Sequence, residues 1–183
     1  MLNPVLLSNF EQFAEVFAQP NPVVVMAVGL PGCGKSTIYK NLVDLIKEVE
    51  IEDEYVHIST DKWIERFSKD AGSTYNNIFE ETIKKATSLM NSDLDNAIKN
   101  GQNVYWDQTN LALASRKKKL SRFPDSYTKV ALYVPIPGDE IWKSRLAGRP
   151  DKTIPDNVLQ SMIKSLQIPT LDEGFDLVHV WKE

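Results

Sequence analysis

Gly29-Leu30-Pro31-Gly32-Cys33-Gly34-Lys35-Ser36-Thr37 has the pattern G-x-x-x-x-G-K-S, which is typical of a phosphate-binding P-loop. The β-branched apolar run from Val23 to Val28 precedes it, as expected of a buried parallel strand. Apolar residues follow at helical spacing and predict a helix that begins near Ser36: Ile38, Leu42, Leu45 and Ile46. A glycine-rich loop between a strand and a helix lets backbone N–H groups point at phosphate oxygens. The stretch therefore predicts a nucleotide-binding α/β domain.

The P-loop also predicts how the nucleotide is held, with ATP as the expected nucleotide and Mg²⁺ as its ion. Lys35 is expected to reach the β- and γ-phosphates, and the Ser36 hydroxyl to bind Mg²⁺. Cys33 also fits as a small filler at a variable loop position. The alternative for the whole motif is a chance turn before a core helix, which the flanking strand and helix disfavour. The residues predicted to bind the nucleotide are Gly29, Pro31, Gly32, Cys33, Gly34, Lys35, Ser36 and Thr37.

Length and composition predict one globular domain over residues 1–183. The net charge of −4 argues against attraction of the whole molecule to nucleic acid, so such binding would need a local basic patch. Cys33 is the only cysteine, which excludes an internal disulfide and favours a reducing compartment. The first residues lack the basic start of a signal peptide, and no apolar run approaches the ~20 residues of a membrane span. We therefore expect a cytoplasmic protein.

Strand and helix patterns alternate along the chain. We expect strands at 23–28, 55–59, 103–106, 128–134 and 176–181, and helices at 8–18, 62–69, 74–100, 139–147 and 155–166. The long helix carries an apolar stripe from Ile78 to Ile98, with Phe79 in it, which we expect to be core. Alternating strands and helices predict a mostly parallel sheet with helices on both faces. Ligands bind at the carboxyl edge of such sheets, where the P-loop, Asp61 and Asp107 are all expected.

Two aspartates follow strands at that edge. Asp61 is a candidate general base that takes the proton of an acceptor hydroxyl, or alternatively a helix N-cap. Asp107 suits a Walker-B residue that holds Mg²⁺, or alternatively a polar strand end. Thr109 and Asn110 either bind substrate or form a turn, and the sequence leaves both readings open. Three separate stretches thus converge on one candidate site.

Several basic and aromatic residues have two interpretations each. Arg145 and Arg149 are four apart, and they fit either a pair that stabilises the transferring phosphoryl group or residues favoured at a helix C-terminus. The run Arg116 to Lys119 fits a nucleic-acid contact or a solvated helix face. Trp63 could stack on a base as part of the substrate site, although a core position is favoured. His57 and His179 have no metal-ligand spacing and are interpreted as structural.

From about Val23 to Leu166 the chain resembles the kinase domain of phage polynucleotide kinases, within the small P-loop kinases. The stretches that carry the resemblance are the P-loop, Ser59-Thr60-Asp61, Asp107-Gln108-Thr109-Asn110-Leu111, Arg145-Leu146-Ala147-Gly148-Arg149, Lys152-Thr153-Ile154-Pro155 and Val158-Leu159-Gln160-Ser161-Met162-Ile163-Lys164-Ser165. The resemblance implies a five-stranded parallel core with a helical lid, here about residues 139–155. It implies that Asp61 is the general base and that Arg145 and Arg149 belong to the lid over the nucleotide.

One position departs from that family. Its members carry an arginine three residues after the base aspartate, which grips the phosphate next to the acceptor, and here this residue is Ile64. The 5-hydroxymethyluracil DNA kinases of phages look similar in size and in their P-loop context. The resulting hypothesis is an ATP- and Mg²⁺-dependent kinase for a hydroxyl on DNA, either a hydroxymethylated pyrimidine or a 5′-hydroxyl end. The alternatives are a kinase for a nucleoside or sugar, and a nucleotide-dependent switch or hydrolase.

Overall fold

A five-stranded parallel sheet forms the centre of the computed structural model, which describes residues 20–48, 55–149 and 151–182. The strand order is β2-β3-β1-β4-β5, and every pair of neighbours is parallel, as predicted. The helix predicted at 8–18 lies outside the described residues. The strands are β1 (Val23–Val28), β2 (Tyr55–Ile58), β3 (Asn103–Asp107), β4 (Thr128–Tyr133) and β5 (Leu177–Val180).

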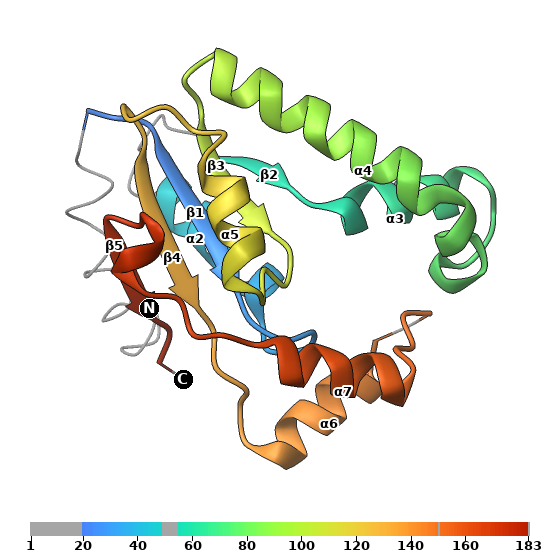
Figure 1. The fold of residues 1–183 in the computed structure, drawn as a ribbon. Coiled ribbons are helices and arrows are strands. Elements are labelled where there is room, and N and C mark those ends of the chain that lie inside the picture. The colour runs from blue at the N-terminus through green and yellow to red at the C-terminus, as the bar shows by residue number, and fades with distance from the viewer. Residues whose placement is uncertain (1–19, 49–54, 150, 183) are drawn as a thin grey trace.

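Six α-helices and one short 3-10 helix are described around this sheet (Figure 1). Most of their bounds agree with the sequence patterns to within two residues, and the long helix begins at Tyr75, directly after its N-cap Thr74. Neither the helix at Leu113–Leu120 nor the short helix at Leu171–Glu173 was among the predicted helices. The helices are α2 (Lys35–Glu48), α3 (Thr60–Asp70), α4 (Tyr75–Lys99), α5 (Leu113–Leu120), α6 (Asp139–Ala147), α7 (Asp156–Ser165) and η1 (Leu171–Glu173).

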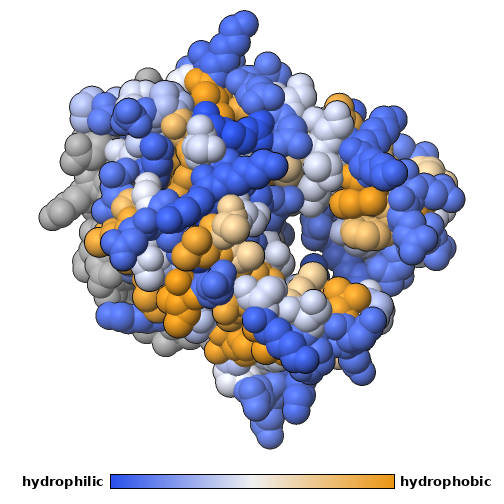
Figure 2. Space-filling model, viewed as in Figure 1, coloured by the Kyte–Doolittle hydropathy of each residue, from blue (hydrophilic) through white to orange (hydrophobic). Residues whose placement is uncertain are grey.

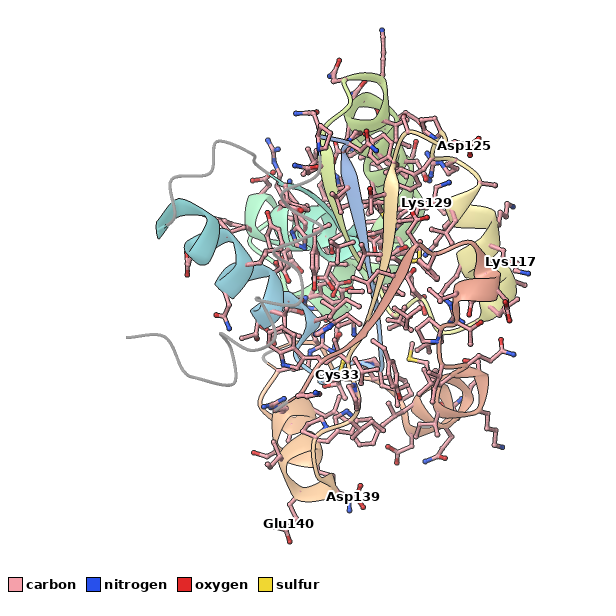
Figure 3. The ribbon with its side chains drawn as sticks, turned by 90° about the vertical axis from the view of Figure 1, so that its left-hand side faces the viewer. Cys33, Lys117, Asp125, Lys129, Asp139 and Glu140 are labelled. Atoms are coloured by element: carbon pink, nitrogen blue, oxygen red, sulfur yellow. The ribbon has the colours of Figure 1, made fainter. Side chains whose placement is uncertain are left out.

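Both faces of the sheet are covered by helices, because side chains alternate along each strand. On β1, Val23, Val25 and Ala27 join one apolar cluster with Ile38 and Leu42 of α2. The intervening Val24 and Met26 join a second cluster, together with Met90 and Leu94 of α4 and Leu120 of α5. The central strand is therefore buried on both sides, which explains its continuous apolar sequence. Figure 3 views the sheet edge-on, with α2 on one side and α5 on the other.

The junction between β2 and α3 differs from the sequence prediction. The helix starts at Thr60, two residues earlier than expected, and Ser59 occupies the N-cap position. Asp61 therefore lies in the first turn of the helix, where a carboxylate is favoured by the helix dipole. The alternative reading of Asp61 as the N-cap is wrong. Among the described residues, no helix is both long and apolar enough to cross a membrane.

Candidate active site

A large cleft opens at the carboxyl edge of the sheet, with a volume of about 1470 Å³. Its walls come from the P-loop, the starts of α3 and α4, the end of β3, and the segment from Arg145 to Met162. Figure 2 shows the molecule hollowed between the α3–α4 part and the α6–α7 part, with apolar surface on both sides. Asp61, Asp107 and the P-loop line this one cleft, as the position of strand ends predicts.

The P-loop is held from several sides. The buried Lys35 donates from Nζ to the carbonyl oxygens of Gly29 (2.9 Å) and Leu30 (2.8 Å). The indole Nε1 of Trp142 on α6 donates to the Pro31 carbonyl at 2.7 Å. Gly32 has φ +79°, a conformation that favours glycine, and an added Cβ would lie 3.1 Å from the Leu146 side chain. Close packing of α6 on the loop thus explains why glycine is required there.

A short hydrogen bond joins the two predicted metal ligands. The Ser36 hydroxyl donates to Asp107 Oδ2 at 2.7 Å, and His57 Nε2 lies 3.1 Å from the same oxygen. Burial opposes ionisation of Asp107, but the hydrogen bonds from His57 and Ser36 and the charge of Lys35 outweigh it and lower the pKa of this carboxyl. A hydroxyl and an ionised carboxylate are hard oxygen ligands, the donor set that Mg²⁺ prefers. The two side chains fit an Mg²⁺ site completed by nucleotide phosphates.

His57 contacts Asp107 of this site, although the sequence analysis did not place it there. Its ring stacks on Tyr39 of α2, with ring centroids 4.2 Å apart, while its Nε2 meets Asp107. The interpretation as a structural histidine with no metal-ligand spacing misses this contact, because His57 lies on β2 and Asp107 on the neighbouring β3. Only the parallel pairing of β2 with β3, which sets Ile58 beside Trp106, brings them together. A polar residue near a strand end was the one available signal.

Asp61 lies across the cleft at the centre of a second polar cluster. Tyr75 Oη donates to its Oδ1 at 2.8 Å, and Lys152 Nζ donates to its Oδ2 at 3.1 Å. Arg149 Nη2 lies 3.8 Å from Oδ2, and Lys152 also contacts Glu65. Burial, followed by the negative charge of Asp61, raises the pKa of the Tyr75 phenol far above its usual value, so the phenol keeps its proton. The sequence did not single out Tyr75.

The two arginines of the predicted lid line the cleft at different places. Arg145 extends from α6 towards the P-loop, with its Nη1 3.5 Å from the Cys33 carbonyl oxygen. Arg149 lies beside Asp61 instead. The backbone N–H of Asn76 donates to the Asp151 carbonyl at 3.2 Å, which fixes the loop against the start of α4. One segment therefore contacts both the nucleotide side and the Asp61 side of the cleft.

Three residues with suggested ligand contacts have other partners. Trp63 does not line the cleft, because its Nε1 donates to Asp93 at 2.8 Å and its ring packs against the core. Asn110 is buried and donates to the Ala27 carbonyl at 2.7 Å, so it forms the turn rather than facing a substrate. Arg116 is fully buried against Glu173. The basic run on α5 is therefore no continuous surface, and neither interpretation of the run, a nucleic-acid contact or a solvated helix face, holds for Arg116. Thr109 does line the cleft.

The apolar stripe of α4 is only partly core. Ala86, Met90, Leu94 and Ala97 are buried, as predicted. Phe79 is 38 % exposed and lines the cleft, as does Val158 of α7, which is 39 % exposed. The first turns of α4 extend beyond the sheet, so their apolar side chains have no strand to cover them. The prediction that Phe79 is a core residue is wrong.

Comparisons with known proteins agree with this geometry. The family model described as "AAA domain" matches residues 24–169. A chain of the PezAT toxin–antitoxin system of Streptococcus pneumoniae has a TM-score of 0.65 at 16 % identity, over 100 % of this chain and 78 % of that one. Shikimate kinase from Acinetobacter baumannii has a TM-score of 0.53 at 19 % identity, over 92 % and 88 %. These two likenesses show the fold.

A chain of the Pnkp1/Rnl/Hen1 complex is also similar, with 25 % identity and a TM-score of 0.49. The match covers 69 % of this chain but only 40 % of the other.

Proposed function

The chain belongs to the AAA domain family, and on that premise we propose that it is a kinase that transfers the γ-phosphate of ATP to a hydroxyl group. One observation carries the proposal. The P-loop with its Ser36–Asp107 pair and the carboxylate of Asp61 face the same cleft, from different elements. Phosphoryl transfer needs a site for phosphates and Mg²⁺ and a group that positions the nucleophile.

Each side chain has a role in this reaction. The P-loop amides and Lys35 bind the phosphates of ATP, while Ser36 and Asp107 would hold Mg²⁺, which neutralises developing charge when bound. Asp61 accepts the proton of the acceptor hydroxyl as its oxygen bonds to the γ-phosphorus and the bond to ADP breaks. Arg145, from the P-loop side, and Arg149, from the Asp61 side, stabilise the charge on the transferring group.

For the acceptor we propose a hydroxyl carried by DNA, on a hydroxymethylated pyrimidine or at a 5′ end. The motifs shared with polynucleotide kinases support this assignment. The cleft-lining Phe79 and Val158 supply exposed apolar surface on which a base could pack. Ile64 is fully buried, so the position at which the family has a phosphate-gripping arginine cannot contact a 5′-terminal nucleotide. This burial favours the base-carried hydroxyl over the 5′ end.

The test uses γ-labelled ATP, Mg²⁺ and three oligonucleotides. One has a free 5′-hydroxyl, one has a blocked end and an internal 5-hydroxymethyluracil, and one is blocked and unmodified. We expect label on the second, and label on the first alone would assign the 5′ end instead. Lys35→Met and Asp61→Asn should both abolish transfer, and Asp61→Asn should still bind ATP. Full transfer by Asp61→Asn would contradict the assignment of the base.

A small-molecule acceptor is the second candidate, and one observation favours it. Glu80 and Glu81 of α4 line the same cleft as Asp61, and carboxylates repel a phosphate backbone. The burial of Arg116 also removes one of the cations of the run for which a nucleic-acid contact was one interpretation. Label on none of the three oligonucleotides, with ATP turnover that depends on Lys35, would support a nucleoside or sugar as the acceptor.

A further inference from the structure

Both carboxylate oxygens of Asp61 are engaged by side chains of the protein itself. Tyr75 donates to Oδ1 at 2.8 Å, and Lys152 donates to Oδ2 at 3.1 Å. A general base must offer one oxygen to the hydroxyl whose proton it takes, within hydrogen-bond distance. Each oxygen can accept a second hydrogen bond, but Oδ2 also has Arg149 Nη2 at 3.8 Å, so an acceptor hydroxyl competes there with two cationic groups. Tyr75 and Lys152 differ in how readily they can make way for it.

Tyr75 is the fixed partner of the two. It occupies the first position of α4, directly after the cap Thr74, so its backbone is set by a helix. Its ring packs against Phe79 with centroids 5.6 Å apart. The phenol is a donor over the whole working pH range, because burial and the charge of Asp61 keep it protonated.

Lys152 is the exchangeable partner. It follows α6 on a loop, and its ammonium group lies between two carboxylates, Asp61 on one side and Glu65 on the other. The same nitrogen lies 4.6 Å from the centroid of the Tyr75 ring. Asp61 and Glu65 are four residues apart on α3, hence on one face of that helix. Lys152 can therefore leave Asp61 without losing a carboxylate partner.

We propose that Tyr75 is the positioning residue of Asp61, and that Lys152 occupies Oδ2 until an acceptor hydroxyl displaces it onto Glu65. This proposal rests on the proposed function, because it takes Asp61 as the base. Tyr75 holds Oδ1 and fixes the direction of Oδ2. The acceptor hydroxyl replaces the ammonium group of Lys152 at Oδ2. The proton of that hydroxyl passes to Oδ2, while the hydroxyl oxygen bonds to the γ-phosphorus and the bond between the γ-phosphorus and ADP breaks. Lys152 then pairs with Glu65 alone.

The first test is Tyr75→Phe, with Tyr127→Phe as its matched control. Tyr127 also donates from a phenol, to the carbonyls of Ala97 and Gln102, far from Asp61. We expect Tyr75→Phe to lower kcat about tenfold and leave the KM for ATP unchanged. Loss of a donor disfavours the ionised carboxylate, so the acid limb of the pH–rate profile moves to higher pH. Tyr127→Phe should leave that profile in place, whatever it does to folding.

A second readout needs no acceptor. In protein labelled with ¹³C at aspartate carboxyl carbons, the Asp61 signal is the one that Asp61→Asn removes. The charged or titratable groups around the Asp61 carboxylate are Arg149, Lys152, Glu65 and Tyr75. Tyr75→Phe should move the titration of this signal to higher pH. An unmoved titration would overturn the role of Tyr75.

The exchange of Lys152 is tested by a double-mutant cycle. Glu65→Gln removes the second carboxylate, so Lys152 stays on Asp61. We expect the KM for the acceptor that takes phosphate in the labelling test to rise severalfold. In the Lys152→Met background the same Glu65→Gln change should have no effect. Glu140→Gln is the control, because Figure 3 shows Glu140 on α6 pointing away from the molecule. Equal effects in both backgrounds would overturn the exchange.

The proposed function and this inference fail in different ways. Retained transfer in Asp61→Asn removes the base and both proposals with it. Abolished transfer in Asp61→Asn, with an unchanged pH profile in Tyr75→Phe, leaves the kinase and overturns the positioning role.

Discussion

Arg116 lies inside the molecule and binds Glu173 of η1 through two hydrogen bonds of 2.6 Å. Its Nη1 also donates to the carbonyls of Asn110, Leu111 and Gln167, so one guanidinium joins the loop after β3 to the chain after α7. The sequence showed a run of four basic residues, and nothing in that run separated the buried one from its neighbours. What distinguishes Arg116 from its neighbours is its ion-pair partner Glu173, which lies 57 positions further along the sequence.

Arg116→Met tests this buried pair. The change leaves the Glu173 carboxylate buried without its cation, so we expect the free energy of unfolding to fall by about 3–5 kcal/mol. Urea denaturation of both proteins measures it. Lys117→Met is the matched control, because Lys117 is exposed on the same helix and should cost less than ~0.5 kcal/mol (Figure 3). Similar losses in the two variants would contradict the ion-pair explanation.

Lys119 makes the stability depend on pH in the alkaline range. Burial, and secondarily the charge of Arg122, lowers the pKa of Lys119 from 10.5 to about 8. Between these values the unfolded chain binds more protons than the folded one, so the free energy of unfolding rises with pH in that window. Relative to Lys119→Met, the wild type should gain on the order of 2 kcal/mol between pH 7 and 10. Urea denaturation of both proteins at pH 7 and at pH 10 measures this gain. The same difference in the free energy of unfolding between wild type and Lys119→Met at the two pH values would refute it.

Positions of site residues were predictable where a motif fixes them and not where a tertiary contact does. The positions of Lys35, Ser36 and Asp107 at the cleft follow from the P-loop pattern and a strand end. Tyr75 and His57 depend on which helix or strand lies alongside, and no local pattern encodes that. Asn110 looked like a ligand residue because the sequence cannot distinguish a buried turn amide from an exposed one.

At the scale of elements, the P-loop and α6 act as one packed unit. Gly32 lies against Leu146 and Trp142, with an added Cβ 3.1 Å from the former's side chain. We expect Gly32→Ala to weaken ATP binding about tenfold, because the loop must shift away from α6. Isothermal titration with Mg·ATP measures the affinity.

The control for this change is Gly72→Ala. Gly72 also has a positive φ, +58°, but an added Cβ would meet nothing within 4 Å. The Gly72→Ala variant should have backbone strain without any new contact, and it should bind ATP as tightly as the wild type does. Equal losses of affinity in the two variants would show that strain, rather than the contact with α6, is responsible.

Most elements were predictable because their periodicity is strong, and the errors are of three kinds: an element's end, a missed short helix and a misjudged exposure. The start of α3 was placed two residues late, since Thr60 and Asp61 suit either a strand end or a first helical turn. The three-residue η1 has no period to detect. The exposed position of Phe79 could not be read from α4, because the sequence does not say how far a helix extends past the sheet.

For the whole molecule, the net charge of −4 limits how a nucleic acid can bind. With Arg116 buried, we expect any DNA contact to come from cations at the cleft, such as Arg149. Replacing both Lys117 and Lys118 with Gln should therefore leave DNA affinity unchanged, and log K should fall with log salt at a shallow slope of about −1 to −2. Fluorescence anisotropy with a labelled single strand gives both numbers. If the slope of log K against log salt is smaller in magnitude in the double variant than in the wild type, Lys117 and Lys118 on α5 contact DNA after all.

The segment from Arg145 to Lys152 contacts the P-loop at one end and Asp61 at the other. A substrate that fixes one end of this segment therefore also favours its contacts at the other end. ATP and acceptor should then bind with positive cooperativity. Because such coupling is reciprocal, ATP must tighten the acceptor by the same factor by which the acceptor tightens ATP.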